Sequence, residues 1–164
     1  MTKLVPRTIE WIDSAPVRIP ASARSTASPD AVFAVLAEHE RWPEWFTSVK
    51  SVEVMGAPSG VGARRRVKVP GLTVDEEFIV WEPGVRWSFT GLEARPGITR
   101  SLVEDCRLTP VSGDGGGTDI TYTMYLDPPT WMRPLLAVLA PQLRRNNNKA
   151  MENLARRAAA PPTA

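Results

Sequence analysis

Proline and glycine interrupt the middle of the chain at short intervals, and this spacing restricts the fold more than any other feature of the sequence. The segments between them are rich in strand-forming residues, as expected for strands joined by turns. The interruptions fall at Gly56–Gly62, Pro70–Gly71, Pro83–Gly84, Gly91–Gly97 and Pro110–Gly117. We therefore predict an antiparallel meander with strands at about residues 17–26, 48–55, 63–69, 72–82, 85–90, 99–109 and 118–126.

The Pro70–Gly71 turn allows the register of its two strands to be predicted. If these residues form a two-residue hairpin turn, the flanking strands pair residue by residue away from it. The face that carries Val67 and Val74 is then apolar except for one ion pair, between Arg65 and Glu76. The pairs expected on the other face are Lys68 with Thr73, Arg66 with Asp75 and Arg64 with Glu77. Because opposite charges meet there, we expect that face to be exposed.

The same rule applied to the Pro83–Gly84 turn continues the apolar face. The inner pairs expected are Phe78 with Phe89 and Val80 with Trp87. Trp81 and Arg86 would then lie together on the outer face. Two turns thus predict the same inner face.

Helices are predicted on both sides of the meander. Ser28 can cap a short helix that begins at Pro29, and Pro43 can open a second short helical turn. A long helix is predicted from Thr130 to about Arg157, bent at Pro141, which falls opposite its apolar stripe. The stripe consists of Met132, Leu135, Leu136, Leu139, Leu143, Ala150, Met151 and Leu154. This face should cover the sheet.

Length, composition and charge are those of one ordinary globular domain. The 164 residues are 43% hydrophobic and 23% charged, and the net charge is only +2, which requires no nucleic-acid partner. The start lacks the apolar stretch of a signal peptide, and no apolar run is long enough to span a membrane. With a single cysteine, Cys106, these observations favour a cytoplasmic location.

The sequence offers no catalytic triad, metal site or cofactor motif. One histidine, His39, and one cysteine, Cys106, supply neither a Ser-His-Asp arrangement nor a zinc ligand set. Gly113–Gly117 is followed by a strand, so we interpret it as a hairpin loop and not as a phosphate-binding loop. The cations of the last helix are typical of a solvated face, with a transient contact to an anionic membrane as the alternative: Arg144, Arg145, Lys149, Arg156 and Arg157.

A wide sheet covered by one helix leaves concave surface unfilled, so we predict an apolar cavity between them. Arg65 and Glu76 should mark its polar end, because an ion pair on an apolar face needs further hydrogen bonds that a ligand could supply. Asn147 is a polar residue on the apolar stripe of the last helix. The predicted ligand-binding residues are Arg65, Glu76, Phe78, Trp87, Phe89, Glu104, Tyr122, Met124, Leu139, Leu143 and Asn147.

The chain from about residue 17 to residue 157 resembles the SRPBCC superfamily, which includes START-type lipid-transfer domains and polyketide cyclases. The resemblance rests on Ser28–Leu36 running on to Arg41–Trp45, on the turn Trp81–Gly84 and on the Gly117–Thr118 entry to the last strand. It implies an α+β helix-grip fold, in which a curved seven-stranded antiparallel sheet wraps around a long C-terminal helix and two short helices follow strand one. These motifs are structural and carry no catalytic residue.

This resemblance and the predicted cavity lead to three functional hypotheses. The first is a carrier or sensor that binds a small hydrophobic molecule, such as a lipid, a polyketide-like aromatic or an isoprenoid, without a cofactor. The second is a polyketide cyclase or dehydratase in which Glu76, Glu104 or Tyr122 exchanges protons. The third is an interaction module that acts through its outer face or its N-terminal arm.

The expected organisation is an N-terminal arm at residues 1–16, a helix-grip ligand-binding domain at 17–157 and a disordered tail at 158–164. Within the arm, Ile9–Ile12 could add an edge strand or form a contact in a homodimer.

Overall fold

The computed structural model describes residues 1–113 and 116–160. Its centre is one antiparallel sheet with the strand order β2-β8-β7-β6-β5-β4-β3, and β1 pairs with β6. The strands are β1 (Thr2–Lys3), β2 (Val17–Ser25), β3 (Ser51–Met55), β4 (Arg64–Val69), β5 (Leu72–Glu82), β6 (Arg86–Arg95), β7 (Leu102–Pro110) and β8 (Thr118–Leu126). The predicted α+β helix-grip fold is confirmed, with β1 as an unpredicted eighth strand.

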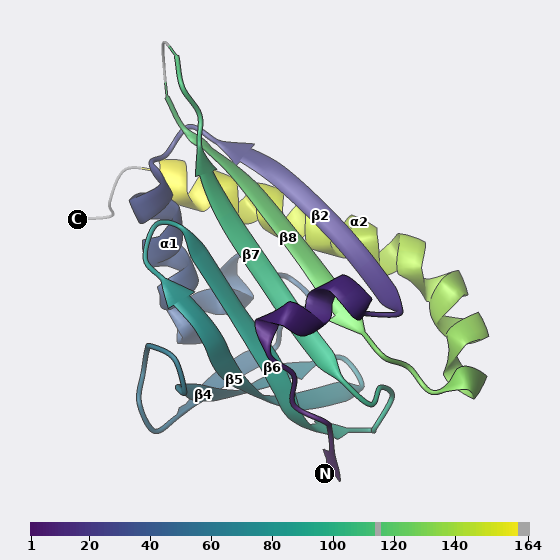
Figure 1. Cartoon of the computed structure of the whole chain (residues 1–164). Helices are drawn as coiled ribbons and strands as arrows, with labels where there is room; N and C mark the ends of the chain where they lie inside the picture. The colour runs from purple at the N-terminus through teal and green to yellow at the C-terminus, as the bar shows by residue number, and fades with distance from the viewer. Residues whose placement is uncertain (114–115, 161–164) are drawn as a thin grey trace.

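Helix α2 (Arg133–Ala159) lies along the sheet beside β2, and α1 (Pro29–Ala37) packs near its C-terminal end (Figure 1). Two hydrogen bonds hold this end of α2 in place. Ser25 Oγ donates to the Ala155 carbonyl at 2.9 Å, and Asn153 Nδ2 donates to the Trp45 carbonyl at 2.8 Å. The sheet curves around the space that this helix covers.

The first of the two short helical segments begins where the sequence predicts: Ser28 Oγ accepts a hydrogen bond from the Ala31 amide and caps α1. The second, the 3-10 helix η2 (His39–Glu44), begins at His39 and contains Pro43, so the prediction that Pro43 opens it is wrong. The Pro83–Gly84 turn reaches the start of α1. Gly84 has a φ of +71°, a left-handed backbone conformation that favours glycine, and a Cβ there would meet the Asp30 carboxylate.

The Pro70–Gly71 register is confirmed, whereas the Pro83–Gly84 register is only half right. Every predicted pair of the first hairpin is present, including Arg65 opposite Glu76. In the second hairpin Glu82 pairs with Arg86, so the loop has three residues, Pro83–Val85, instead of the two predicted, and Val80 pairs with Ser88. An irregularity at Ile79 then shifts the register by one residue, and Phe78 lies opposite Phe89 as predicted.

The longer loop corrects the position of Trp81. It pairs with Trp87 instead of lying outside with Arg86. Its ring packs edge-on against Phe33 at 5.3 Å and against Phe78 at 5.0 Å between centroids, so it belongs to the inner aromatic cluster. Arg86 is on the outer face, where it bonds Asp105.

The N-terminal arm folds back onto the same chain. The Leu4 amide donates to the Leu92 carbonyl at 2.8 Å, and the Arg7 amide donates to Thr90 Oγ1 at 2.9 Å. The 3-10 helix η1 (Ile9–Ser14) crosses the outer side of the sheet (Figure 1). The prediction of an edge strand at Ile9–Ile12 is therefore wrong, and Thr2–Lys3 supply the strand instead.

Helix α2 is longer than the sheet surface that it covers. Its second half buries Asn147, Ala150, Met151, Leu154 and Ala155. In its first half, Leu135 is 50% exposed and Leu139 is 45% exposed, so the prediction that Leu139 points inward is wrong. The apolar stripe continues beyond the end of the core because periodicity does not reveal where the partner surface stops. The helix also extends to Ala159, and residues 161–164 of the predicted tail lie outside the described residues.

Candidate functional site

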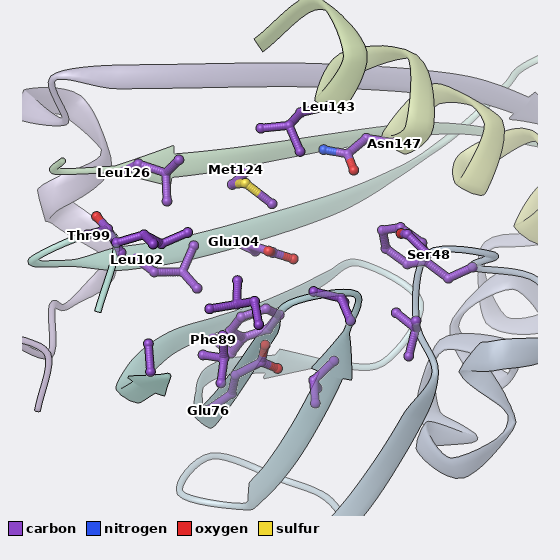
Figure 2. A pocket seen from close by; sticks show the side chains of 18 of the residues that line it. Ser48, Glu76, Phe89, Thr99, Leu102, Glu104, Met124, Leu126, Leu143 and Asn147 are labelled. Carbon is purple, nitrogen blue, oxygen red and sulfur yellow. The ribbon is translucent and has the colours of Figure 1, made fainter. Parts of the chain in front are cut away.

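A cavity of about 360 Å³ lies between the inner face of the sheet and α2. Leu143 and Asn147 reach into it from α2, opposite Glu76 and Phe89, and Glu104 lies between them (Figure 2). The predicted site residues that line it are Arg65, Glu76, Phe89, Glu104, Met124, Leu143 and Asn147. The structure thus brings seven of the eleven predicted residues to one cavity. The volume lies in the range of small-molecule sites.

The remaining four predicted residues do not line the cavity. Phe78, Trp87 and Tyr122 are buried behind the lining, where they support Arg65 and Glu104. Leu139 is 45% exposed and does not line the cavity. These positions alternate correctly along their strands, but alternation alone does not distinguish a cavity wall from packed core.

Arg65 is the most deeply buried cation of the described residues, with 1% of its surface exposed. Its Nε donates to Glu76 Oε2 at 2.7 Å, and its Nη1 donates to His39 Nδ1 at 3.2 Å. Its third nitrogen, Nη2, is buried without a hydrogen-bond partner. One donor of the guanidinium is therefore left for another group.

Aromatic rings surround the Arg65 guanidinium. Its Cζ lies 3.9 Å from the ring centre of Trp42 and 4.9 Å from that of Phe89. Phe78 and Trp87 follow at 5.1 and 5.2 Å. These cation–π contacts replace part of the water that burial removes. Because all four rings belong to the core, they also fix the position of the cation.

His39 belongs to this network, and the sequence interpretation missed it. Burial and the positive charge of Arg65 lower the pKa of His39 to about 3, so the imidazole is neutral. Its Nδ1 then accepts from Arg65 and its proton resides on Nε2. The signal was present in the sequence: Val32, Leu36 and His39 share the spacing of one helical face.

Two carboxyl groups lie near the single cation. Burial raises the pKa of Glu76 to about 7, although Arg65 opposes the shift. Burial and the charge of Glu76 raise the pKa of Glu104 to about 8. The Tyr122 hydroxyl donates to Glu104 Oε2, and burial raises the pKa of Tyr122 well above its usual value. At neutral pH one of the two carboxyl groups therefore keeps a proton in the cavity wall.

Asn147 adds a second unused donor. It is 3% exposed, and its Nδ2 has no hydrogen-bond partner. Its neighbour on the helix, Asn146, is exposed and accepts a hydrogen bond from Gln142. An unpartnered buried amide is costly, and the Asn147 side chain points into the cavity, so its Nδ2 is available to a group there (Figure 2).

Three lining segments were not predicted. Leu4 comes from the N-terminal arm, Ser48 follows η2, and Ile98 and Thr99 lie in the loop between β6 and β7. Exposed lining residues mark where the cavity meets solvent, and Ile98 is one of them, at 37% exposure. None of these residues belongs to a periodic segment, so no sequence pattern identified them.

No group of three or more His, Cys, Asp or Glu side chains within residues 1–113 and 116–160 could hold a metal ion. Cys106 is 1% exposed, and burial raises its pKa far above the usual value, so its thiol is unreactive. The polar chemistry of the cavity therefore rests on Arg65, two carboxyl groups and an amide.

Solved structures show the same fold at low sequence identity. A protein from Thermus thermophilus is 20% identical and has a TM-score of 0.69, covering 90% of this chain and all of that one (100%). The ZhuI aromatase/cyclase of a Streptomyces species is 18% identical with a TM-score of 0.68, covering 87% and 93%. A START superfamily protein of Mycobacterium smegmatis is 12% identical with a TM-score of 0.67, covering 85% and 97%.

Sequence comparison places the chain in a family. An uncharacterized protein of Mycobacterium tuberculosis is 31% identical over 150 residues, which are 90% of this chain and 88% of that protein. The family model for polyketide cyclase/dehydrase and lipid transport matches residues 16–159, which contain the sheet from β2 onward, α1 and α2. The family and the fold agree, and this chain belongs to the polyketide cyclase/dehydrase and lipid transport family.

Proposed function

We propose that the protein binds a small, neutral and largely apolar molecule in this cavity, as a carrier or sensor. One observation carries the proposal: an apolar cavity of about 360 Å³ has two buried, unpartnered donors at its wall, Arg65 Nη2 and Asn147 Nδ2. A ligand with a carbonyl or hydroxyl oxygen would satisfy these donors, while its hydrocarbon part fills the rest of the space.

The charges around Arg65 favour a neutral ligand over an anionic one. Glu76 already neutralises the guanidinium, and Glu104 is a second acid beside the same cavity. A ligand carboxylate would add negative charge to a buried site with only one cation, which is unfavourable. A ligand with an anionic end is therefore less favourable than one with a neutral carbonyl or hydroxyl end.

A cyclase or dehydratase is the second candidate, and the state of Glu104 supports it. A buried carboxyl group with a pKa of about 8 can hold a proton at neutral pH and give it to a ligand oxygen. Tyr122 holds this group in place through its hydroxyl. The similarity to an aromatase/cyclase is compatible with this alternative. Perturbed acids also occur in binding sites, so turnover must be tested directly.

Native mass spectrometry of the protein as purified tests the proposal first. We expect an additional mass that is released on denaturation and that corresponds to a neutral, oxygen-containing molecule. Incubation of that molecule with the protein then separates the two candidates, because a carrier returns it unchanged and a cyclase or dehydratase changes its mass or its absorbance. Purification without any bound mass, followed by failure to bind the probes below, would contradict the proposal.

Binding of 1-dodecanol and dodecanoate, measured by calorimetry at neutral pH, tests the preference for neutral ligands. These probes have equal chain lengths and differ in their charged end. We expect the alcohol to bind at least about tenfold more tightly than the carboxylate, because only the carboxylate adds buried charge. Equal affinities, or tighter binding of dodecanoate, would contradict this preference.

Asn147→Leu tests the amide contact. We expect the variant to bind 1-dodecanol about twofold to tenfold more weakly, because one hydrogen bond is lost. Gln142→Leu, five residues earlier on the same helix, is the matched control, since Gln142 is exposed and does not line the cavity. If both variants behave alike, Asn147 does not contact the ligand.

A further inference from the structure

The first half of α2, together with the turn before it, exposes large apolar side chains. Val138 is 75% exposed and Trp131 is 70% exposed, and Leu135 and Leu139 are close to half exposed. Figure 1 shows this end of α2 turning away from the sheet. We call these four residues the α2 apolar patch. A contiguous patch of this kind on one element indicates a contact surface.

The same half of the helix forms a wall of the cavity. Leu136 and Leu143 line the cavity, while Leu135 and Leu139 are exposed. Ile98, another exposed apolar residue, lines the cavity from the β6–β7 loop. A partner on the α2 apolar patch would therefore lie next to the place where the cavity meets solvent.

Positive charge is concentrated around the patch. Residues 128–151 contain four cations and no acidic residue, so the remainder of the chain, whose total is +2, carries −2. Arg133, Arg144, Arg145 and Lys149 are exposed, and none of them forms an ion pair within the described residues. Elsewhere on the surface most arginines have acidic partners, as Arg24 has Asp119.

We propose that the α2 apolar patch docks on an anionic lipid bilayer. Apolar side chains flanked by cations on one helix are the pattern of a helix that lies in the membrane interface. Within the described residues, no helix is long and apolar enough to cross a bilayer, so α2 lies on the surface. Insertion of Trp131 and Val138 among the headgroups brings Arg144 and Arg145 to the lipid phosphates.

The positive charge around the α2 apolar patch also argues against a second copy of this chain as the partner that covers it. A symmetric dimer through this patch would bring two sets of four cations together with no acid between them. Like charges across an interface oppose association, whereas the same cations attract an anionic surface. The inference does not depend on which ligand the cavity binds.

Co-sedimentation with vesicles tests the proposal. One set of vesicles contains phosphatidylcholine alone, and the other contains equal parts of phosphatidylcholine and phosphatidylglycerol. We expect the full chain to bind the anionic vesicles and to bind the neutral ones at least about tenfold more weakly. Weak or absent binding to both sets, or equal binding to both, would overturn the proposal.

Two variants separate the apolar and the charged contributions. Val138→Asp should weaken binding to anionic vesicles at least about tenfold, because it places a carboxylate in the interface. Arg144→Gln with Arg145→Gln should weaken it roughly thirtyfold, since each cation near such a surface contributes about 1 kcal/mol. Both sites are exposed, so the melting temperature should not change.

Matched controls lie away from α2. Val61 is 70% exposed in the β3–β4 loop, so Val61→Asp repeats the apolar change elsewhere. Lys50→Gln with Lys68→Gln removes two exposed charges from another part of the surface. The controls should bind vesicles like the original chain. If they weaken binding as much as the α2 variants do, or if Val138→Asp instead dissociates a dimer in sedimentation-velocity runs, the α2 apolar patch is not a membrane-docking surface.

Discussion

Each face of the β4–β5 hairpin carries an ion pair between an arginine and a carboxylate, but one pair is buried and the other lies at the surface. Arg65 bonds Glu76 on the inner face and Arg66 bonds Asp75 on the outer face, each through Nε at 2.7 Å. The inner side chains are 1% and 5% exposed, whereas the outer ones are 35% and 10% exposed. The two ion pairs are thus neighbours along the same two strands, yet one lies in the core and the other lies at the surface.

The two pairs are satisfied in different ways. Arg66 bonds both oxygens of Asp75, at 2.7 and 2.8 Å, and water can reach its remaining groups. Arg65 makes one bond to Glu76 and depends on His39 and on aromatic rings for the rest. A buried pair needs this second set of contacts because burial removes the solvation of both charges. The inner pair should therefore respond far more strongly to substitution.

The largest effect is expected for Arg65→Met. This change keeps much of the side-chain volume but leaves Glu76 buried without its cation. Near pH 8 it should lower the free energy of unfolding by about 3–5 kcal/mol. At about pH 5 the loss should be smaller, because Glu76, whose pKa burial already raises to about 7, then holds a proton. Urea unfolding at both pH values measures the difference.

Its control is Glu77→Gln, which removes a half-buried partner of the exposed Arg64 on the other face of the same strand. That variant should show little change at either pH. An equal loss for Arg65→Met at both pH values would mean that Glu76 stays charged or stays solvated without its partner, and the inner face would then resemble the outer one.

A pH-dependent effect of intermediate size is expected for the unmodified protein. Glu76 and Glu104 have pKa values that burial raises to about 7 and 8, so between pH 6.5 and 8 the folded state binds more protons than the unfolded state. The free energy of unfolding should therefore fall as pH rises through this window, by on the order of 2 kcal/mol.

Between pH 6.5 and 8, titration of His39 does not oppose this fall in the free energy of unfolding. Its pKa is lowered from 6.5 to about 3, so it increases stability as pH rises only up to about 6.5. Cys106 and Tyr122, whose pKa values burial raises, remain protonated in the window. Glu104→Gln should remove at least half of the fall in stability between pH 6.5 and 8, and an unchanged slope would show that Glu104 is not protonated in the folded protein.

A smaller effect is expected for Asp75→Asn. Asp75 is 7% exposed, which makes it more buried than the sequence predicted for the outer face, because the Arg66 guanidinium covers it. Loss of the carboxylate should lower the free energy of unfolding by about 1 kcal/mol. Thermal melts measure it, and a loss as large as that of Arg65→Met would remove the distinction between the faces.

The two hairpins also differ in how well their register could be predicted from the sequence. A turn of two residues at Pro70–Gly71 and strand alternation were sufficient to place Arg65 opposite Glu76 on the inner face. The same reasoning failed for Trp81, because the Pro83–Gly84 turn has a third loop residue, Val85, which displaces the pairing next to it by one residue. The register predicted from a turn is therefore correct only if the number of loop residues is correct.

The site was predictable in its polar centre and less so at its edges. Arg65, Glu76, Glu104 and Asn147 stand out as polar residues at apolar positions, and all four line the cavity. The prediction failed for two residues, His39 and Leu139. His39 joins the network through a tertiary contact, and Leu139 leaves it because α2 extends beyond the sheet. The position of Leu139 depends on where α2 leaves the sheet, which periodicity does not contain, and the helical spacing of His39 indicates its face but not its partner Arg65.

The smallest change in the free energy of unfolding is expected for Arg64→Met, because this arginine belongs to the most exposed ion pair of the hairpin. Arg64 bonds Glu77 at 2.6 Å, but its side chain is 54% exposed and that of Glu77 is 27% exposed. Water replaces the lost partner, so the free energy of unfolding should change by well under ~1 kcal/mol and less still in high salt. Urea unfolding with and without added salt measures both quantities. A loss of several kcal/mol would mean that Arg64 is anchored as firmly as Arg65, and strand alternation would no longer explain why one arginine of this run is essential to the core and its neighbour is not.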